Sequence, residues 1–465
     1  METIICKTPI YQIKPNQFNM KSKITKMKTT FYLLLSAFCF LHLSLKAQND
    51  TLIINATEKT EMKQLKEELD NNVIEIKKLK KLKVSGYIQA QFEVGQEFAT
   101  TRVGNPTTYD SKRDGKSSDF IRFGIRRGRI KFTWEESFGS AVFQLDITER
   151  AIALQEVYFK VSEPWLNIAS LTVGVFNRPF GDEIAYSSSR RESPERTVLY
   201  QELFPGSKDL GAMVTLAAPK GTPVEGLELD AGAFCGNGIA VPDNGKIDFI
   251  GHLKYNKKWS KITVGLGASA YIGTVRNQDS LLYTVINGKW ERGDSIAGNR
   301  KNARQYVGFD AQFSAKTSWG FSNIRAEVLF GKQPSTQNSF RSPNRDLMQF
   351  GNGVMFNRIR NFWGAHLYFV QDIYKTPLTV VLKYAYMNPN TKLKREEVKS
   401  ITDLAYHYLG AGLLVRCTSN LRLLCFYELP FNSTKNGFET PDENVLDYTK
   451  HVKEGVFTCR LQYRF

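Results

Sequence analysis

The final eleven residues, 455–465, alternate strictly between two kinds of side chain. One parity is apolar apart from Gly455 and ends in Phe465, whereas the other is mostly polar and includes Arg460 and Arg464. Successive side chains of a strand point to opposite faces, so this pattern predicts a strand with one apolar and one polar face. Its length suits a tilted crossing of a bilayer. An edge strand of a soluble sandwich would show the same pattern, so the rest of the chain has to distinguish a membrane barrel from a soluble sandwich.

Similar alternation recurs between turn-forming segments along most of the chain. It predicts strands near 84–94, 120–134, 138–148, 153–161, 170–178, 209–218, 226–235, 246–256, 261–274, 303–316, 321–331, 361–373, 377–388, 404–416, 420–430 and 453–465. This makes about sixteen strands, and an even number of antiparallel strands is typical of bacterial transmembrane barrels.

The connections between these strands alternate between short and long. Residues 135–137 and 257–260 form short connections, whereas 95–119 and 179–208 are long and polar. Such alternation gathers the long loops at one end, as outer-membrane barrels do. The connection near Arg150 is an exception, because it is short although it falls at the long-loop end. A closed barrel also leaves no free sheet edge, and no second apolar layer is visible that would cover a soluble sandwich.

Composition agrees with a barrel better than with helical membrane spans. Outside the N-terminal region we find no run of 18 apolar residues, although 42% of all residues are hydrophobic. Aromatic residues make up 12%, which suits the aromatic girdles of a barrel. We therefore predict an all-β fold, a transmembrane antiparallel β-barrel of about sixteen strands over residues 84–465, preceded by a signal peptide and a short helical coiled-coil segment.

Residues 1–47 predict a secretory signal peptide. Basic residues precede an apolar run at Phe31–Leu45, and Ala47 offers a small residue for cleavage. Met27 is the natural start, which makes residues 1–26 an upstream extension. The whole chain has a formal net charge of +17 and remains basic without this segment. A basic exported chain favours anionic partners, which include anionic solutes, lipopolysaccharide phosphates and nucleic acid. Of these we expect small anions, together with outer-membrane lipid, and no nucleic acid.

Residues 48–83 predict a periplasmic helix. Met62, Leu65, Leu69, Asn72, Ile76 and Leu79 follow one another at alternating steps of three and four. These are heptad a and d positions, so the pattern favours a short coiled coil between like subunits. A solvated charged linker with transient helix is the alternative.

The stretch from Phe120 to Trp134 is rich in arginine. Its apolar residues change parity at Arg126 and Arg127, as a β-bulge would cause. If the apolar side faces lipid throughout, the cations that line one wall of the lumen are Arg122, Arg126, Arg127, Arg129 and Lys131. Such a wall would concentrate anions, because guanidinium groups match oxyanion oxygens and stay charged at any working pH.

The alternative is an arginine cluster that nearby acids neutralise, as in a general porin. Asp146, Glu156 and Glu183 are the candidate acids, and Asp146 is itself predicted to face the lumen. No nucleophile motif, cofactor loop or metal-ligand spacing accompanies the cations, so we expect neither an enzyme nor a cofactor. Cys425 and Cys459 fall on apolar strand faces, where lipid-facing small hydrophobes are favoured over a disulfide framework.

A second stretch resembles a known family. The matching residues are Phe176–Gly181, Glu195, Arg196 and Asp209–Gly211, together with the arginine-rich strand and the closing residues 460–465. In these residues the chain from Val84 to Phe465 resembles the phosphate-selective porin O and P family, as found in Bacteroidetes. The resemblance implies a sixteen-stranded, trimeric porin whose long segment after strand 170–178 folds inward as the constriction. The arginines it would place near the narrowest part are Arg178, Arg190, Arg191 and Arg196.

These observations predict a porin in the outer membrane of a Gram-negative bacterium. Its expected activity is passive diffusion of small anionic solutes, phosphate among them, through an arginine-lined lumen. A general or oligosaccharide porin is one alternative. A barrel whose outer loops bind a surface partner is another.

Overall fold

The computed structural model describes residues 51–96, 99–100, 102–103, 120–239, 247–276, 282–293, 301–337, 339–341, 358–434 and 449–465. The predicted signal peptide lies outside the described residues. The chain divides into two compact units, Met1–Lys77 and Lys78–Phe465. Helix α2, Thr51–Leu79, falls within the segment predicted to be helical, and its many Leu, Lys and Glu residues are good helix formers. Among the described residues, no helix is long and apolar enough to cross a membrane.

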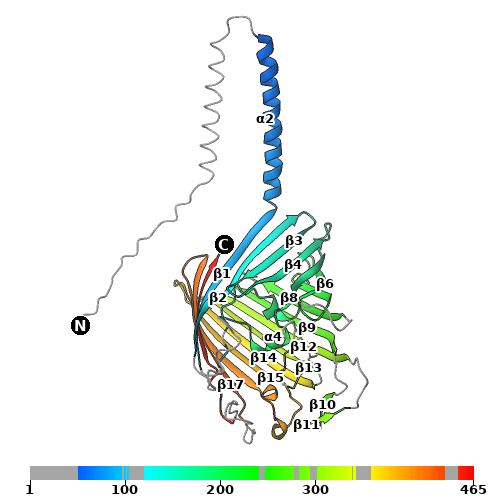
Figure 1. Cartoon of the computed structure of the whole chain (residues 1–465), viewed down its shortest axis with the longest axis vertical. Coiled ribbons are helices and arrows are strands. Elements are labelled where there is room, and N and C mark those ends of the chain that lie inside the picture. Colours follow the sequence, from blue (N-terminus) through cyan, green and yellow to red (C-terminus); the bar gives the residue numbers. More distant parts are fainter. Residues whose placement is uncertain are drawn as a thin grey trace, which may run out of the picture. The chain divides into compact units, whose positions relative to one another are not determined.

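The second unit is a closed antiparallel barrel of sixteen strands (Figure 1). They are β1 (Leu82–Gly95), β2 (Phe120–Glu136), β3 (Gly139–Ile147), β4 (Ile152–Ser162), β5 (Ala169–Asn177), β6 (Lys208–Ala217), β7 (Leu227–Phe234), β8 (Asp248–Lys258), β9 (Ile262–Arg276), β12 (Lys301–Thr317), β13 (Gly320–Ser335), β14 (Arg358–Asp372), β15 (Leu378–Asn388), β16 (Tyr406–Arg416), β17 (Leu421–Asn432) and β18 (Val456–Arg464). Each pairs with the next barrel strand along the chain, and β18 pairs with β1. The predicted antiparallel barrel of about sixteen strands is therefore confirmed.

Two short strands lie in a connection where the sequence pattern predicted none. β10 (Tyr283–Ile286) and β11 (Lys289–Arg292) form a hairpin between β9 and β12. A single parallel pairing of Tyr283 with Arg358 joins this hairpin to β14. Strands of four residues are too short to show an alternating pattern, which explains why the sequence did not reveal them.

The seam between β1 and β18 ends on a reciprocal pair of backbone hydrogen bonds. The amide nitrogen of Gly86 donates to the carbonyl oxygen of Phe465, and that of Phe465 donates to Gly86, both over 3.0 Å. A Cβ atom at Gly86 would collide with the Phe465 ring and the Arg129 carbonyl oxygen, so glycine allows this close approach. The barrel thus closes without leaving an unpaired edge, as a bilayer requires.

The two faces of the barrel wall differ as alternation predicts. Outward side chains such as Ile121 and Phe123 are 67% and 71% exposed, whereas inward Gln89, Gln91 and Glu93 are at most 1% exposed. The predicted bulge is also confirmed. Opposite β1 the pairing of β2 skips Arg126, which lets the cations on both sides of the bulge remain on the lumen side.

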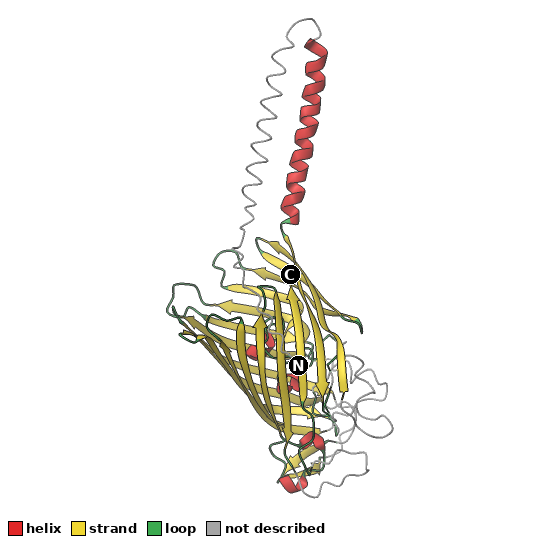
Figure 2. Ribbon diagram, turned by 90° about the vertical axis from the view of Figure 1, so that its left-hand side faces the viewer, coloured by secondary structure: helices red, strands yellow, loops and turns green. Residues whose placement is uncertain are grey.

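The long connections lie at one end of the barrel, and one of them folds inward from that end. Residues 148–151 form the single short connection at that end, as expected near Arg150. The connection between β5 and β6, residues 178–207, contains the short helices α3 (Gly181–Ala185) and α4 (Val198–Leu203). Figure 2 shows these helices among the strands, inside the barrel. We call residues 178–207 the constriction segment.

Candidate functional site: the lumen and its constriction segment

The constriction segment enters and leaves the wall at adjacent points. Asn177 and Lys208 are register partners on β5 and β6. Just inside them, Nε of Arg178 lies 2.9 Å from Oδ2 of Asp209, and both side chains are at most 1% exposed. The backbone nitrogen of Arg178 also donates to the carbonyl oxygen of Ser207 over 3.1 Å. Arg178 therefore anchors the base of the segment, and it does not line the lumen cavity described below.

Aromatic packing fixes one side of the segment to the barrel wall. Its buried apolar residues pack against inward side chains of β7, β8, β9, β12, β13 and β14. The segment contributes Phe180, Ile184, Leu199, Tyr200, Leu203 and Phe204, and the wall contributes Phe234, Ile250, Tyr271, Tyr306, Leu329 and Phe362. Ring centroids of Phe180 and Phe204 lie 4.9 Å apart, and those of Phe204 and Tyr306 lie 5.7 Å apart. This cluster fills the lumen beside these strands.

Hydrogen bonds attach the segment to the same wall. The backbone nitrogen of Gly181 donates to Oγ of Ser269 over 2.9 Å, and Gly181 has a φ of +65° that favours glycine. Oε1 of Glu183 accepts from the Tyr368 hydroxyl over 3.0 Å. Glu192 forms an ion pair of 2.7 Å with Arg325. Packing and tethers together hold the segment across the lumen.

On the opposite side, Glu195 binds three wall arginines. Its carboxylate lies 2.7 Å from Nε of Arg126, 2.7 Å from Nη2 of Arg127 and 3.0 Å from Nη2 of Arg460. Burial by itself raises the pKa of Glu195, but the charges of Arg126, Arg127 and Arg460 outweigh burial and hold that pKa well below its ordinary value. Glu195 is therefore ionised at any physiological pH and neutralises part of the arginine row.

A cavity of ≈ 620 Å³ lies in the lumen between the segment and strands β1 to β5. Its lining reaches from Ser85 and Arg464, at the end with short connections, to Arg102 and Arg341 in long connections. Among the described residues that line it, ten are Arg or Lys and three are Asp or Glu. Water-filled space with this excess of cations attracts anions. We call this space the basic cavity.

The predicted row of cations on β2 is paired with acids. Besides the two arginines bound to Glu195, Arg129 lies 3.0 Å from Asp146, and Lys131 lies 3.3 Å from Glu156. Glu156 also binds Lys208 over 2.6 Å. Asp146 and Glu156 thus neutralise part of the row, in the way that the alternative hypothesis described. Glu183 does not, because it binds Tyr368 and Thr197 instead.

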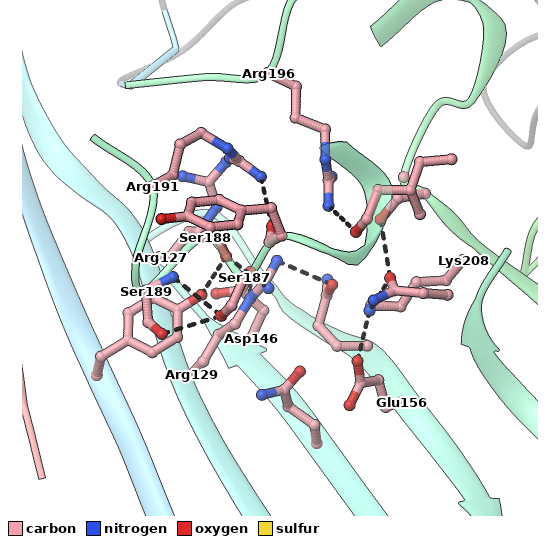
Figure 3. A pocket seen from close by; sticks show the side chains of 18 of the residues that line it. Arg127, Arg129, Asp146, Glu156, Ser187, Ser188, Ser189, Arg191, Arg196 and Lys208 are labelled. Atoms are coloured by element: carbon pink, nitrogen blue, oxygen red, sulfur yellow. Dashed lines mark hydrogen bonds and ion pairs between the residues drawn. The ribbon is translucent and has the colours of Figure 1, made fainter. Parts of the chain in front are cut away.

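Two arginines of the segment carry charge into the cavity without a carboxylate partner in the described part of the chain. Arg191 Nη2 donates to the Tyr186 carbonyl oxygen over 3.3 Å, while its buried Nε has no hydrogen-bond partner. Arg196 donates to the carbonyl oxygens of Glu183 and Ile184, each over 3.0 Å. Figure 3 shows Arg191 and Arg196 around the cavity, with the ion-paired residues on the wall beside them. Backbone carbonyl groups orient a guanidinium but do not cancel its charge.

Two other predicted residues do not line this cavity. Arg122 lies near the start of β2, where its guanidinium is 5.9 Å from the centroid of the Phe120 ring. Arg190 is exposed and lies 5.6 Å from the centroid of the Tyr186 ring. A position within the arginine-rich stretches was therefore not enough to predict which residues line the basic cavity, because the inward fold of the segment decides which side chains meet there.

Several lining residues were not predicted as site residues. Arg464 lines the basic cavity, and Arg460 binds Glu195. Both belong to the polar parity of the closing strand, so alternation alone could have nominated them. Glu195 and Lys208 gave no comparable signal, because their roles depend on how the constriction segment folds against the wall. A second cavity of ≈ 230 Å³ was also missed. Its acidic lining residues are Glu93, Glu195, Glu202, Glu428 and Glu454.

Comparison with known proteins gives the fold. No family model matches the chain, so the resemblance to the phosphate-selective O and P family has no independent support, and no curated protein matches it by sequence. The outer-membrane channel DcaP of Acinetobacter baumannii matches in structure with a TM-score of 0.51 at 12% identity, over 83% of this chain and 97% of that one. OprB of Pseudomonas putida matches with a TM-score of 0.51 at 10% identity, over 85% and 97%. The chain thus has the fold of outer-membrane barrel channels.

Proposed function

We propose that this protein is a porin of the Gram-negative outer membrane that passes small anionic solutes. The basic cavity carries the proposal, because its lining reaches towards both ends of the barrel and has ten cationic against three acidic side chains among the described residues. Arg191 and Arg196 are the expected contacts for an anion in transit. Phosphate is a candidate solute, since guanidinium groups bind phosphate oxygens bidentately.

The neutralised row on β2 favours a second candidate function. Arg126, Arg127, Arg129 and Lys131 all pair with carboxylates, which is the arrangement expected of a general diffusion porin. The two candidates differ in selectivity. Single-channel recording of the refolded protein under a tenfold KCl gradient gives a reversal potential that favours chloride for an anion porin and lies near zero for a general one. Added phosphate should block only the anion porin, and an absence of conductance would contradict both.

Arg191→Gln should reduce anion preference about threefold in the same recording. A unit charge about 6 Å from a permeating ion in water is worth roughly 0.7 kcal/mol, which corresponds to that factor. Arg190→Gln is the matched control, because Arg190 is the next residue along the chain but does not line the basic cavity. Equal effects of the two substitutions would mean that Arg191 does not act on the ion in the cavity.

Anion preference should also rise on acidification from pH 8 to pH 6. Burial raises the pKa of Glu454 to about 7, and Glu454 lines the acidic second cavity. As pH falls through this pKa the carboxylate takes up a proton, so the lumen loses a negative charge. The preference of the pore for anions over cations should then rise by up to about twofold. Reversal potentials at both pH values measure the change. In Glu454→Gln the shift should largely vanish, and a shift that persists unchanged would assign it to another group.

We further propose that the protein is a homotrimer whose α2 helices associate in a coiled coil. The heptad side chains Met62, Leu65, Leu69, Ile76 and Leu79 of α2 are 52–72% exposed. Such an apolar stripe is the pattern that partner helices bury. Leu65→Asp with Leu69→Asp should therefore lower the temperature at which the trimer dissociates on a gel, whereas Lys63→Asp with Lys66→Asp should change it less. Equal shifts would favour a solvated linker.

A further inference from the structure

We propose that Cys425 and Cys459 are joined by an intramolecular disulfide in the exported protein, a covalent link between the last two strands of the barrel. The two residues are direct register partners on β17 and β18. Their sulfur atoms lie 3.4 Å apart as thiols. Directly opposed residues of antiparallel strands have Cα atoms about 4.5–5.5 Å apart, within the range that a disulfide spans. The bond could therefore form with little backbone movement.

The surroundings of the pair would protect such a bond. Cys425 and Cys459 are half-buried and lie between two other register pairs on the outward face, Leu423 with Leu461 and Tyr427 with Phe457. Leu461, Tyr427 and Phe457 are 46%, 40% and 37% exposed on the barrel surface. In a bilayer this surface meets acyl chains, which exclude charged reagents. Oxidation would then precede insertion, and the finished bond would be shielded from polar reductants.

The chemistry requires an oxidant, and the export route passes through a compartment in which disulfides form. We assign this role to an exported dithiol oxidant in its disulfide form. One cysteine thiolate attacks a sulfur of that disulfide and gives a mixed disulfide, and the second thiolate then displaces the oxidant. Two protons and two electrons leave the cysteine pair, and the oxidant departs as its dithiol.

The bond would act on the strand that closes the barrel. Cys425 and Cys459 are 34 residues apart in sequence, and the long connection 433–455 lies between them. A bond between them brings β17 and β18 together before they pair, so less loop-closure entropy is lost when the pairing forms. The same bond fixes the register of that hairpin. β18 would then meet β1 as part of a preformed hairpin.

Counting thiols tests the proposal without relying on transport. In the full-length Cys235→Ser, Cys417→Ser variant, Cys425 and Cys459 are the cysteines that remain among the described residues. Purified from outer membranes without reductant and labelled in denaturant with a maleimide-polyethylene glycol, it should take up two more labels after reduction than before. Adding Cys425→Ser should remove this difference. An equal number of labels with and without reduction in the parent variant would overturn the proposal.

Two further measurements separate the proposed bond from other disulfides. On a non-reducing denaturing gel the variant should run as a single chain, and a dimer that reductant dissolves would show an intermolecular bond instead. A charged phosphine reductant should leave the pair oxidised in the folded, detergent- or lipid-bound protein and reduce it after denaturation. Rapid reduction of the folded protein would contradict the placement of the bond in the bilayer.

Discussion

Glu195→Gln should make the pore about threefold more selective for anions and should also loosen the constriction segment. The substitution keeps the shape of the side chain but removes the charge that compensates Arg126, Arg127 and Arg460. One more uncompensated unit charge near the permeating ion is worth roughly 0.7 kcal/mol. Removing one partner of a buried ion pair destabilises a protein by about 3–5 kcal/mol, so the free energy of unfolding should fall as well.

The reversal potential under a KCl gradient and the thermal unfolding midpoint measure these two effects. Glu136→Gln is the matched control, because Glu136 also pairs with a cation, Lys81, but does not line the basic cavity. The control should leave the reversal potential unchanged. If Glu195→Gln lowered anion preference, or left it at the value of the parent protein, the neutralising role of Glu195 would be wrong.

Phe204→Ala should enlarge the pore and increase single-channel conductance. The Phe204 ring is 2% exposed, contacts Phe180, Tyr200, Tyr271 and Tyr306, and borders the basic cavity. Removing a buried phenyl ring costs about 3–5 kcal/mol, because the lost contacts are only partly replaced. The segment should therefore be held less firmly, and the space vacated by the ring should join the cavity.

Conductance and current noise in a planar bilayer report both consequences. Phe309→Ala makes the same chemical change on the outward face of β12, where Phe309 is 51% exposed. It should leave conductance unchanged and cost less stability in detergent. An unchanged conductance in Phe204→Ala would mean that the cluster around Phe204 does not limit the pore.

The sequence predicted the barrel because every strand repeats a local rule. Alternation placed the strands within a few residues, and the parity change around Arg126 located the bulge. The strands β10 and β11 escaped detection because four residues carry too little pattern. α3 and α4 have only five and six residues, too few to show a helical periodicity in the sequence. Their burial inside the barrel depends on tertiary packing, which a local pattern does not predict.

The site was predicted less well than the fold, because charge pairing is decided in three dimensions. Alternation put Arg127, Arg129 and Lys131 on the lumen side, yet it could not show that Glu195 would reach Arg126 and Arg127 from a segment some seventy positions away. The family resemblance implied that Arg178 lies near the narrowest part of the pore, but its buried ion pair with Asp209 makes it an anchor of the segment. Arg191 and Arg196 instead carry charge into the cavity without a carboxylate partner in the described part of the chain, and their contacts depend on the inward fold.

The constriction segment leaves and rejoins the wall at two residues that already face each other across β5 and β6. A replacement peptide could therefore begin and end at the same two residues, which the pairing of β5 with β6 already holds together. Exchange of this one inserted peptide would remove the charges of Arg191 and Arg196 and leave the cations of the wall strands in place. The same property makes residues 178–207 a natural cassette for grafting the constriction of one pore into another.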